Sequence, residues 1–144
     1  MRGRENKGNK AWQILKNRNE KLYVKCPPLM YRQIEKILGD SRYDLFHFRD
    51  HHSLVQLIKG STEKFRPKRI IYHFTDVSFD RGRIDTRYIT RDLRRLIPRL
   101  YILGIYRSNE DTEKILLSNG VSHALKHSSR RGSEFEQSLQ ELLL

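Results

Sequence analysis

The sequence predicts an α/β fold, in which a doubly wound sheet of five parallel strands carries helices on both faces. Two observations support this prediction. Short apolar runs of about five residues recur along the 144-residue chain, and runs of this length are typical of covered strands. Residues 99–144 alone contain two such runs, each followed by a helix-like segment, and this alternation of strand and helix is typical of a parallel sheet.

Five expected strands alternate with five expected helices. The strands cover residues 21–25, 43–48, 69–74, 100–105 and 121–125. The helices cover residues 29–38, 51–59, 84–97 and 109–119, with a last helix after Ser133. Glycines end three of the helices, at Gly39, Gly60 and Gly120. Pro28 suits a first helical turn, Ser133 and Glu136 have capping-box spacing, and the regular alternation predicts the strand order 2-1-3-4-5.

Length and composition indicate one domain, residues 21–144, after a basic extension, residues 1–20, that we expect to be partly disordered. In the extension, residues 11–17 have the pattern of a short helix that would dock through Trp12 and Leu15. The single cysteine, Cys26, excludes an internal disulfide and favours a reducing, cytoplasmic setting. No apolar run approaches the roughly 20 residues of a membrane span, and no export signal is visible.

The net charge of +12 is concentrated in two regions of the chain. Residues 1–25 contribute +6 and residues 64–107 contribute +8, whereas residues 26–63 are balanced and residues 108–144 contribute −2. Two basic regions indicate an acidic partner, which is either nucleic acid or protein. The alternative is a solvated surface that keeps the protein in solution.

The expected helix at residues 84–97 has an apolar side and a basic side. The apolar side consists of Ile84, Tyr88, Leu93, Leu96 and Ile97. The basic side, here called the arginine face, consists of Arg83, Arg87, Arg91 and Arg94. Arginine forks match phosphate geometry, so this face is a candidate interaction surface, with a solvated helix face as the alternative. No aromatic residue is interleaved with these arginines, which weakens the case for binding a single strand.

Four stretches of the chain carry a resemblance to a known family. They are CPPLMYRQI, FTDVSFDRG, IPRLYILGIYRS and SNGVSHALKHSS. In this order they resemble four segments of the receiver domain of bacterial response regulators of the NarL/LuxR type: an acidic pair followed by HPLVREGL, then TDLSMPxxxG, xPxxxIIxLT and AGVSGYLLKxxS. The resemblance spans about residues 22–143 and implies a flavodoxin-like, receiver-like fold.

The resemblance also implies a pocket at the strand ends. In the family, two acids after strand one hold Mg²⁺, and an aspartate after strand three accepts a phosphoryl group. The acidic pair falls on Lys25 and Cys26, and the acceptor falls on Asp76, because the following VSFDRG matches the family's loop. A count from Pro67 would instead place His73 or Phe74 at the acceptor position.

Two further positions of that pocket contact the phosphorylated product in the family. The hydroxyl position falls on Tyr106, with Ser108 two residues further on. The lysine position falls on Lys126, although a count from Gly120 places His127 there.

The residues at the acidic pair make the implied pocket degenerate. Mg²⁺ is bound mainly by carboxylate, water and phosphate oxygens, and it neutralises the charge of a transferring phosphoryl group. Lys25 can pair with Asp76 by charge but cannot ligate a metal, and Cys26 prefers softer metals. The resemblance therefore implies a pseudo-receiver that needs no cofactor, with Mg²⁺ required only if Asp76 is phosphorylated.

The histidines do not predict a metal site. His47 and His73 fall within expected strands, whereas His51 and His52 begin an expected helix, so no common convergence is indicated. Cys26 has no predictable partner that would activate it as a nucleophile, and we interpret it as a small buried residue.

The leading hypothesis is a non-enzymatic pseudo-receiver in bacterial transcription control. It would act as a protein–protein interaction module and form a dimer with itself or pair with another receiver-containing regulator. One alternative is a phosphorylatable receiver that uses Asp76. The other is a basic protein that binds nucleic acid through the N-terminal extension and the arginine face. The sequence leaves open whether a DNA-binding output domain belongs to this module.

Overall fold

The computed structural model describes residues 19–39, 41–74, 81–107, 110–127 and 132–144, with only the backbone of residues 81–85 and 110. The strands in these ranges are β1 (Glu20–Lys25), β2 (Tyr43–Phe48), β3 (Arg69–His73), β4 (Tyr101–Tyr106) and β5 (His123–Lys126). The helices are α2 (Pro28–Leu38), α3 (His51–Gly60), α4 (Arg81–Leu96), α5 (Glu110–Ser118), α6 (Gly132–Leu143) and the short 3-10 helix η1 (Glu63–Phe65).

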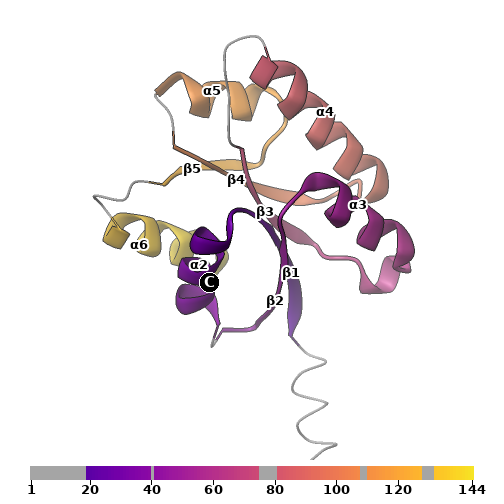
Figure 1. Ribbon diagram of the computed structural model, residues 1–144, viewed down its shortest axis with the longest axis horizontal. Helices are drawn as coiled ribbons and strands as arrows, with labels where there is room; N and C mark the ends of the chain where they lie inside the picture. Colours follow the sequence, from indigo (N-terminus) through magenta and orange to yellow (C-terminus); the bar gives the residue numbers. More distant parts are fainter. Residues whose placement is uncertain (1–18, 40, 75–80, 108–109, 128–131) are drawn as a thin grey trace, which may run out of the picture.

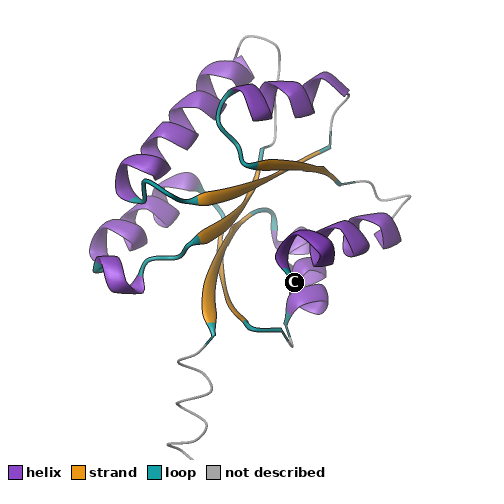
Figure 2. Ribbon diagram, turned by 180° about the vertical axis from the view of Figure 1, so that it is seen from behind, coloured by secondary structure: helices purple, strands orange, loops and turns teal. Residues whose placement is uncertain are grey.

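The five strands form one parallel sheet in the order β2-β1-β3-β4-β5, which confirms the predicted fold class and topology. Figure 1 shows α2 and α6 side by side on one face of the sheet, with α3, α4 and α5 on the other. Figure 2 shows the same layers from behind. None of the described helices combines the length and the apolar composition that a membrane span requires.

The core between the sheet and helices α2 and α6 is built from apolar residues at helical and strand spacing. The helices bury Met30, Ile34, Leu38, Phe135, Leu139 and Leu143. The strands contribute Leu22, Val24, Ile71, Leu103 and Ile105. The hydroxyl of Tyr43 donates a hydrogen bond of 2.6 Å to the backbone oxygen of Leu143, which fixes the end of α6 to the start of β2.

The core on the opposite face lies under helices α3, α4 and α5. The helices contribute Leu54, Val55, Ile58, Leu93 and Leu116. The strands contribute Tyr23, Ile70, Tyr72 and Ile102 among others. Burying one such aliphatic side chain stabilises the fold by about 1.5–3 kcal/mol, so each core can hold its helices against the sheet.

The expected apolar side of α4 is partly wrong. Tyr88 is 62% exposed, whereas Thr86 and Thr90 are buried. The hydroxyl of Thr90 donates a hydrogen bond of 2.7 Å to the backbone oxygen of Asn119. A threonine that satisfies its hydroxyl in this way can bury its methyl group, which a count of apolar residues does not reveal.

Several element boundaries also differ from the expectations. Helix α4 begins three residues earlier than expected, and α6 begins at Gly132, so Ser133 lies inside the helix instead of capping it. Strand β5 begins two residues later, because the backbone N–H of Val121 still bonds to Leu116 at the end of α5. The expected helix at residues 11–17, with Trp12 and Leu15, lies outside the described residues.

Candidate functional site

The carboxyl ends of the strands meet at one edge of the sheet, as parallel pairing requires. Strand β1 ends at Lys25, β3 at His73, β4 at Tyr106 and β5 at Lys126. The register pairs Tyr106 with Lys126 and places the end of β1 beside the end of β3. This edge therefore gathers five of the seven residues predicted for the pocket: Lys25, Tyr106 and Lys126 at the strand ends, and Cys26 and His127 one residue beyond their strands.

Lys25 is tied to the neighbouring strand. Its Nζ atom donates a hydrogen bond of 3.1 Å to the backbone oxygen of His73 and lies 4.8 Å from the centroid of the Tyr72 ring. Burial lowers the pKa of the Lys25 ammonium, and the nearby Cys26 and Asp50 oppose this shift. The residue at the first acidic position is thus a half-buried cation with a defined partner.

Cys26 follows directly and is almost completely buried, with 1% of its surface exposed. Burial raises the pKa of its thiol to about 12, although the adjacent Lys25 acts in the opposite direction. The thiol is therefore protonated at neutral pH, and a protonated thiol is neither a good nucleophile nor a metal ligand. This agrees with its interpretation as a small buried residue at a strand end.

His73 is the last residue of β3. The resemblance assigns the acceptor carboxylate to Asp76, three residues further along the chain. The side chain of His73 is 4% exposed, and neither ring nitrogen has a hydrogen-bond partner among the described residues. Burial lowers the pKa of His73 to about 4, and the positive charges of Lys25 and Arg107 act in the same direction. The imidazole is neutral at pH 7. A count from Pro67 had pointed to this position, but the unpaired burial of the ring was not visible in the sequence.

His127 has a structural role at the same edge. Its Nε2 atom lies 2.7 Å from Oε1 of Gln33 on α2, and its ring packs edge-on against Phe135 on α6. Burial lowers the pKa of His127, with a smaller effect of Arg107. Lys126, in contrast, is exposed at the last position of β5. The strand end therefore carries the lysine, and the histidine after it joins β5 to both covering helices.

The remaining pocket positions differ in what the structure describes. Tyr106 is 5% exposed at the end of β4 and packs in the core under α3, α4 and α5. Burial and the nearby carboxylate of Glu113 raise the pKa of Tyr106, so its hydroxyl stays protonated. Asp76 and Ser108 lie outside the described residues, so the expected pair between Lys25 and Asp76 stays a prediction.

The residues at the positions of the acidic pair and at the end of β3 do not fit Mg²⁺. An ammonium group, a protonated thiol and a neutral imidazole supply none of the carboxylate oxygens that this hard cation prefers. The histidines elsewhere have separate surroundings: Nε2 of His47 lies 2.8 Å from the backbone oxygen of Cys26, whereas Nε2 of His51 lies 2.8 Å from Oδ2 of Asp92. In the described ranges no three potential ligand residues are grouped for a metal ion.

The arginine face needs one correction. Arg94 is not a free surface residue, because its guanidinium bonds to the backbone oxygens of Gly120 and Leu100 and to Oγ of Ser122. Arg87 and Arg91 are exposed as expected, and the side chain of Arg83 is not described. Tyr88, which follows Arg87 in the sequence, is also exposed, so the exposed side of α4 does include an aromatic residue.

Comparison with solved structures relates this architecture to known proteins. The chain is similar to the phosphorylated cyanobacterial phytochrome response regulator RcpA, with a TM-score of 0.65 and 18% identity over 86% of this chain and 91% of that one. The Mn²⁺-bound form of the response regulator Rcp1 gives a TM-score of 0.61 and 20% identity over 86% of this chain and 91% of Rcp1. The response regulator RcsB of Salmonella typhimurium gives 0.62 and 13% identity over 88% of this chain and 58% of RcsB.

Sequence comparison alone finds less. No model of a protein family matches the chain, and no curated protein is similar to it in sequence. The likeness to these solved structures therefore lies in the fold. The chain has the flavodoxin-like fold of the receiver domains of response regulators.

Proposed function

We propose that this chain is a non-catalytic pseudo-receiver, a regulatory interaction module that keeps the receiver fold without the phosphoryl chemistry. The observation that carries the proposal is the hydrogen bond of 3.1 Å from Nζ of Lys25 to the backbone oxygen of His73. It places a cation at the strand end to which the resemblance assigns a Mg²⁺-binding carboxylate. A cation there repels a divalent metal ion, and without the metal the charge of a transferring phosphoryl group is not neutralised.

The neighbouring groups support the same conclusion. Cys26 is a buried, protonated thiol, and His73 is a buried, neutral imidazole with a pKa lowered to about 4. Rcp1 has been described in a Mn²⁺-bound form, whereas in this chain the two positions of the family's acidic pair hold an ammonium group and a protonated thiol. Lys25 instead donates a hydrogen bond from β1 to β3 at this edge.

The partner surface that we propose is the exposed part of α4, here called the α4 face and defined by Arg87, Tyr88 and Arg91. Tyrosine and arginine are among the residue types enriched at the energetic centres of protein interfaces. Tyr88 is 62% exposed, which leaves an unusually large aromatic surface in water. The partner is a second copy of the chain or another receiver-containing regulator. A role in bacterial transcription control rests on the likeness to RcsB, a response regulator studied for its interaction with DNA.

Phosphoryl analogues test the chemical part of the proposal. Beryllofluoride with Mg²⁺ should leave the melting temperature unchanged, because a ligand stabilises the folded state only if it binds to it. Acetyl phosphate with Mg²⁺ should produce no phosphorylated protein, and a receiver with an intact acidic pair serves as the positive control. Stoichiometric phosphorylation of the wild type that disappears in Asp76→Asn would instead support the phosphorylatable receiver.

A charge-reversal pair tests the α4 face. Arg87→Glu with Arg91→Glu should abolish self-association measured by light scattering over a range of protein concentrations. The matched control is Arg32→Glu with Lys36→Glu, which reverses two exposed charges at the same helical spacing on α2. If both pairs associate as the wild type does, the α4 face is a solvated surface and this part of the proposal is wrong.

A further inference from the structure

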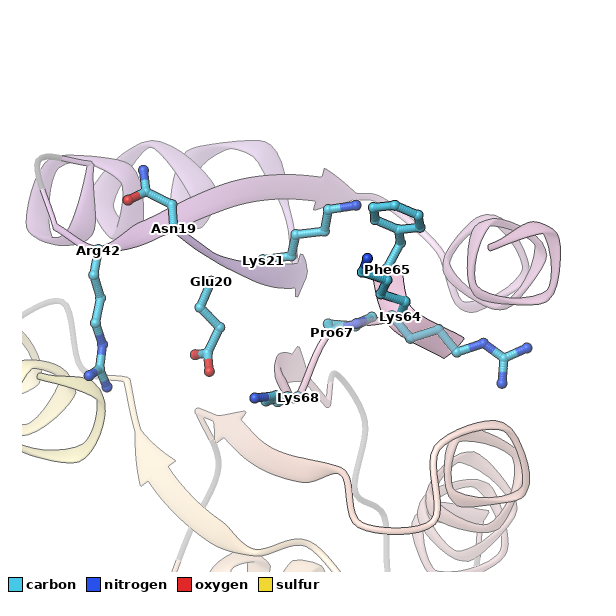
Figure 3. A pocket seen from close by; sticks show the side chains of 9 residues that line it. Asn19, Glu20, Lys21, Arg42, Lys64, Phe65, Pro67 and Lys68 are labelled. Carbon is cyan, nitrogen blue, oxygen red and sulfur yellow. The ribbon is translucent and has the colours of Figure 1, made fainter. Parts of the chain in front are cut away.

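The amino edge of the sheet, opposite Lys25 and His73, carries two adjoining hollows. The first, of about 490 Å³, lies before β1 and β3, and the second, of about 510 Å³, extends it toward the start of β4. The two share the segment from Lys64 to Lys68, without Phe65 in the second. Figure 3 shows the first hollow, with Arg42 on one side, Phe65 on the other and Lys68 below. We call the two together the amino-edge groove.

The groove is strongly basic. Its basic residues are Lys21, Arg42, Lys64, Arg66, Lys68 and Arg99, against two acidic residues, Glu20 and Glu63. The carboxylate of Glu20 forms an ion pair within the chain, since its Oε2 atom lies 3.8 Å from Nε of Arg69. Basic groups that outnumber acidic ones along a concave surface raise the local concentration of anions.

The basic side chains of the groove are of two kinds: some are held by hydrogen bonds within the chain, and others are exposed without such bonds. The guanidinium of Arg42 donates to the backbone oxygen of Leu143 at 3.2 Å, and that of Arg66 donates to the backbone oxygen of Leu96 at 2.7 Å. These two arginines shape the groove before any ligand arrives. The side chains of Lys64, Lys68 and Arg99 are exposed, and no hydrogen bond or ion pair joins them to another described residue. They are available to contact an anion.

An aromatic ring stands among these cations. Phe65 on η1 is 54% exposed, and Nζ of Lys21 lies 5.0 Å from the centroid of its ring. The same ammonium lies 6.0 Å from the ring of Phe46, which is 37% exposed. Figure 3 shows the Lys21 side chain extending toward the Phe65 ring. An exposed ring beside free cations offers a base a stacking surface next to the phosphate contacts. An acidic protein segment would need the cations but not the ring.

We propose that the amino-edge groove binds single-stranded nucleic acid, with Phe65 stacking on a base and Lys64 and Lys68 contacting the backbone phosphates. An unpaired base can reach the ring, whereas the bases of a duplex are stacked on each other. Residues 1–18 join the chain at Asn19, which lines the groove, and their sequence contains six basic residues and one acidic residue. This composition adds attraction for the same polyanion.

Fluorescence anisotropy of the full chain with a short labelled oligouridine tests the proposal at several salt concentrations. The wild type should bind with log affinity falling linearly with log salt. Lys64→Glu with Lys68→Glu should weaken binding at least about tenfold and reduce the salt slope by about 1 to 2. Phe65→Ala should weaken binding about tenfold with the slope unchanged, because stacking releases no counterions, and Phe65→Trp should restore it.

Two matched variants separate the groove from general charge and apolar-surface effects. Arg32→Glu with Lys36→Glu makes the same change in net charge on α2, and Leu117→Ala removes an exposed large apolar side chain from α5. Both should bind the strand within about twofold of the wild type, as expected for positions that carry no phosphate or base contact. Thermal melts of every variant show whether a loss of binding is a loss of folding.

Three outcomes would overturn the proposal. The first is wild-type binding by the folded Phe65→Ala variant. The second is an equal loss of affinity in the α2 control pair, which would mean that net charge alone attracts the strand. The third is that duplex or polyglutamate binds as tightly as the single strand and responds to the same groove variants. This result would assign the groove to another class of partner.

Discussion

Nζ of Lys25, at the end of β1, donates a hydrogen bond of 3.1 Å to the backbone oxygen of His73, at the end of β3. The two strands are neighbours in the middle of the sheet, and Lys25 pairs in register with Tyr72. The bond thus joins the two strands at the edge where the pocket was predicted. The donor, Lys25, is a half-buried cation, so we expect substitution there to affect stability. The acceptor belongs to His73, whose imidazole is buried and neutral, so we expect acid to affect stability as well.

Lys25→Met removes the ammonium and keeps most of the aliphatic stem. We expect the free energy of unfolding in urea to fall by about 1–3 kcal/mol, because the oxygen of His73 loses its charged donor. Lys126→Met is the matched control, since Lys126 ends β5 but is exposed, and it should change stability by no more than about 0.5 kcal/mol. A Lys25→Met variant more stable than the wild type would show that burying the ammonium costs more than its bond contributes.

His73 makes stability depend on pH in a defined direction. Its pKa is about 4 in the folded protein and 6.5 in the unfolded chain, so the unfolded state binds the proton more readily. The stability from this group is present above pH 6.5 and is lost as pH falls toward 4, by about 3 kcal/mol in total.

Urea denaturation of the wild type and of His73→Asn at a series of pH values measures this contribution. The stability advantage of the wild type at pH 7 should shrink steadily between pH 6.5 and 4. His127, whose pKa is also lowered, leaves part of the acid sensitivity in the variant. The variant His52→Asn removes an exposed imidazole from α3 and controls for the loss of a histidine as such. Parallel curves for the wild type and His73→Asn would contradict the prediction.

Arg94→Ala should destabilise the fold by about 1–3 kcal/mol, because it removes a charged donor from partners in the turn between α5 and β5. Arg91→Ala on the same helix removes an exposed guanidinium and should change stability by no more than about 0.5 kcal/mol. Thermal melts of the two variants compare the sites directly. Equal melting temperatures would mean that the contacts of Arg94 contribute nothing measurable.

Gly104→Ala should destabilise the sheet by about 1–3 kcal/mol through overpacking. A Cβ at Gly104 would lie 2.9 Å from Cγ1 of Val121 and 3.2 Å from Cε2 of Phe74. Gly60→Ala is the contrasting change, since nothing lies within 4 Å of a Cβ at the end of α3, and it should stabilise by up to about 1 kcal/mol. Calorimetry gives both shifts, and a stable Gly104→Ala protein would show that the side chains of Val121 and Phe74 can move to make room for the methyl group.

The fold was predictable because its signals are local. Apolar residues recur at helical spacing along α2 and α6, so Ile34 and Leu38, or Phe135 and Leu139, mark a helix face without knowledge of what covers it. Parallel strands with helical crossovers then allow few topologies, and the observed strand order is the one expected. The same rule placed Lys25 and Cys26 at the carboxyl edge, since a residue at the end of a strand stays at that edge whatever its side chain contacts.

The contacts of polar side chains were not predictable, because their partners are distant in the sequence. The sequence predicts Arg94 as a surface residue, but in the fold it bonds to Gly120, which is 26 residues further along the chain. Thr90 is a polar residue by type, but its hydroxyl donates a hydrogen bond to the backbone oxygen of Asn119, so its side chain can be buried. Neither partner has a periodic signal, since a hydrogen bond between separate elements depends on how the helices rotate against the sheet.

The sequence by itself determined the five-unit architecture, the strand ends to within one residue and the excess of positive charge. Only the tertiary structure decided where that charge gathers around a concave surface. The amino-edge groove draws on the start of β1, on η1 and on the turn after α4, which the order of the strands brings together. Phe65 and Lys21 are 44 positions apart in the chain but 5.0 Å apart in space, because β1 and β3 are neighbours in the sheet.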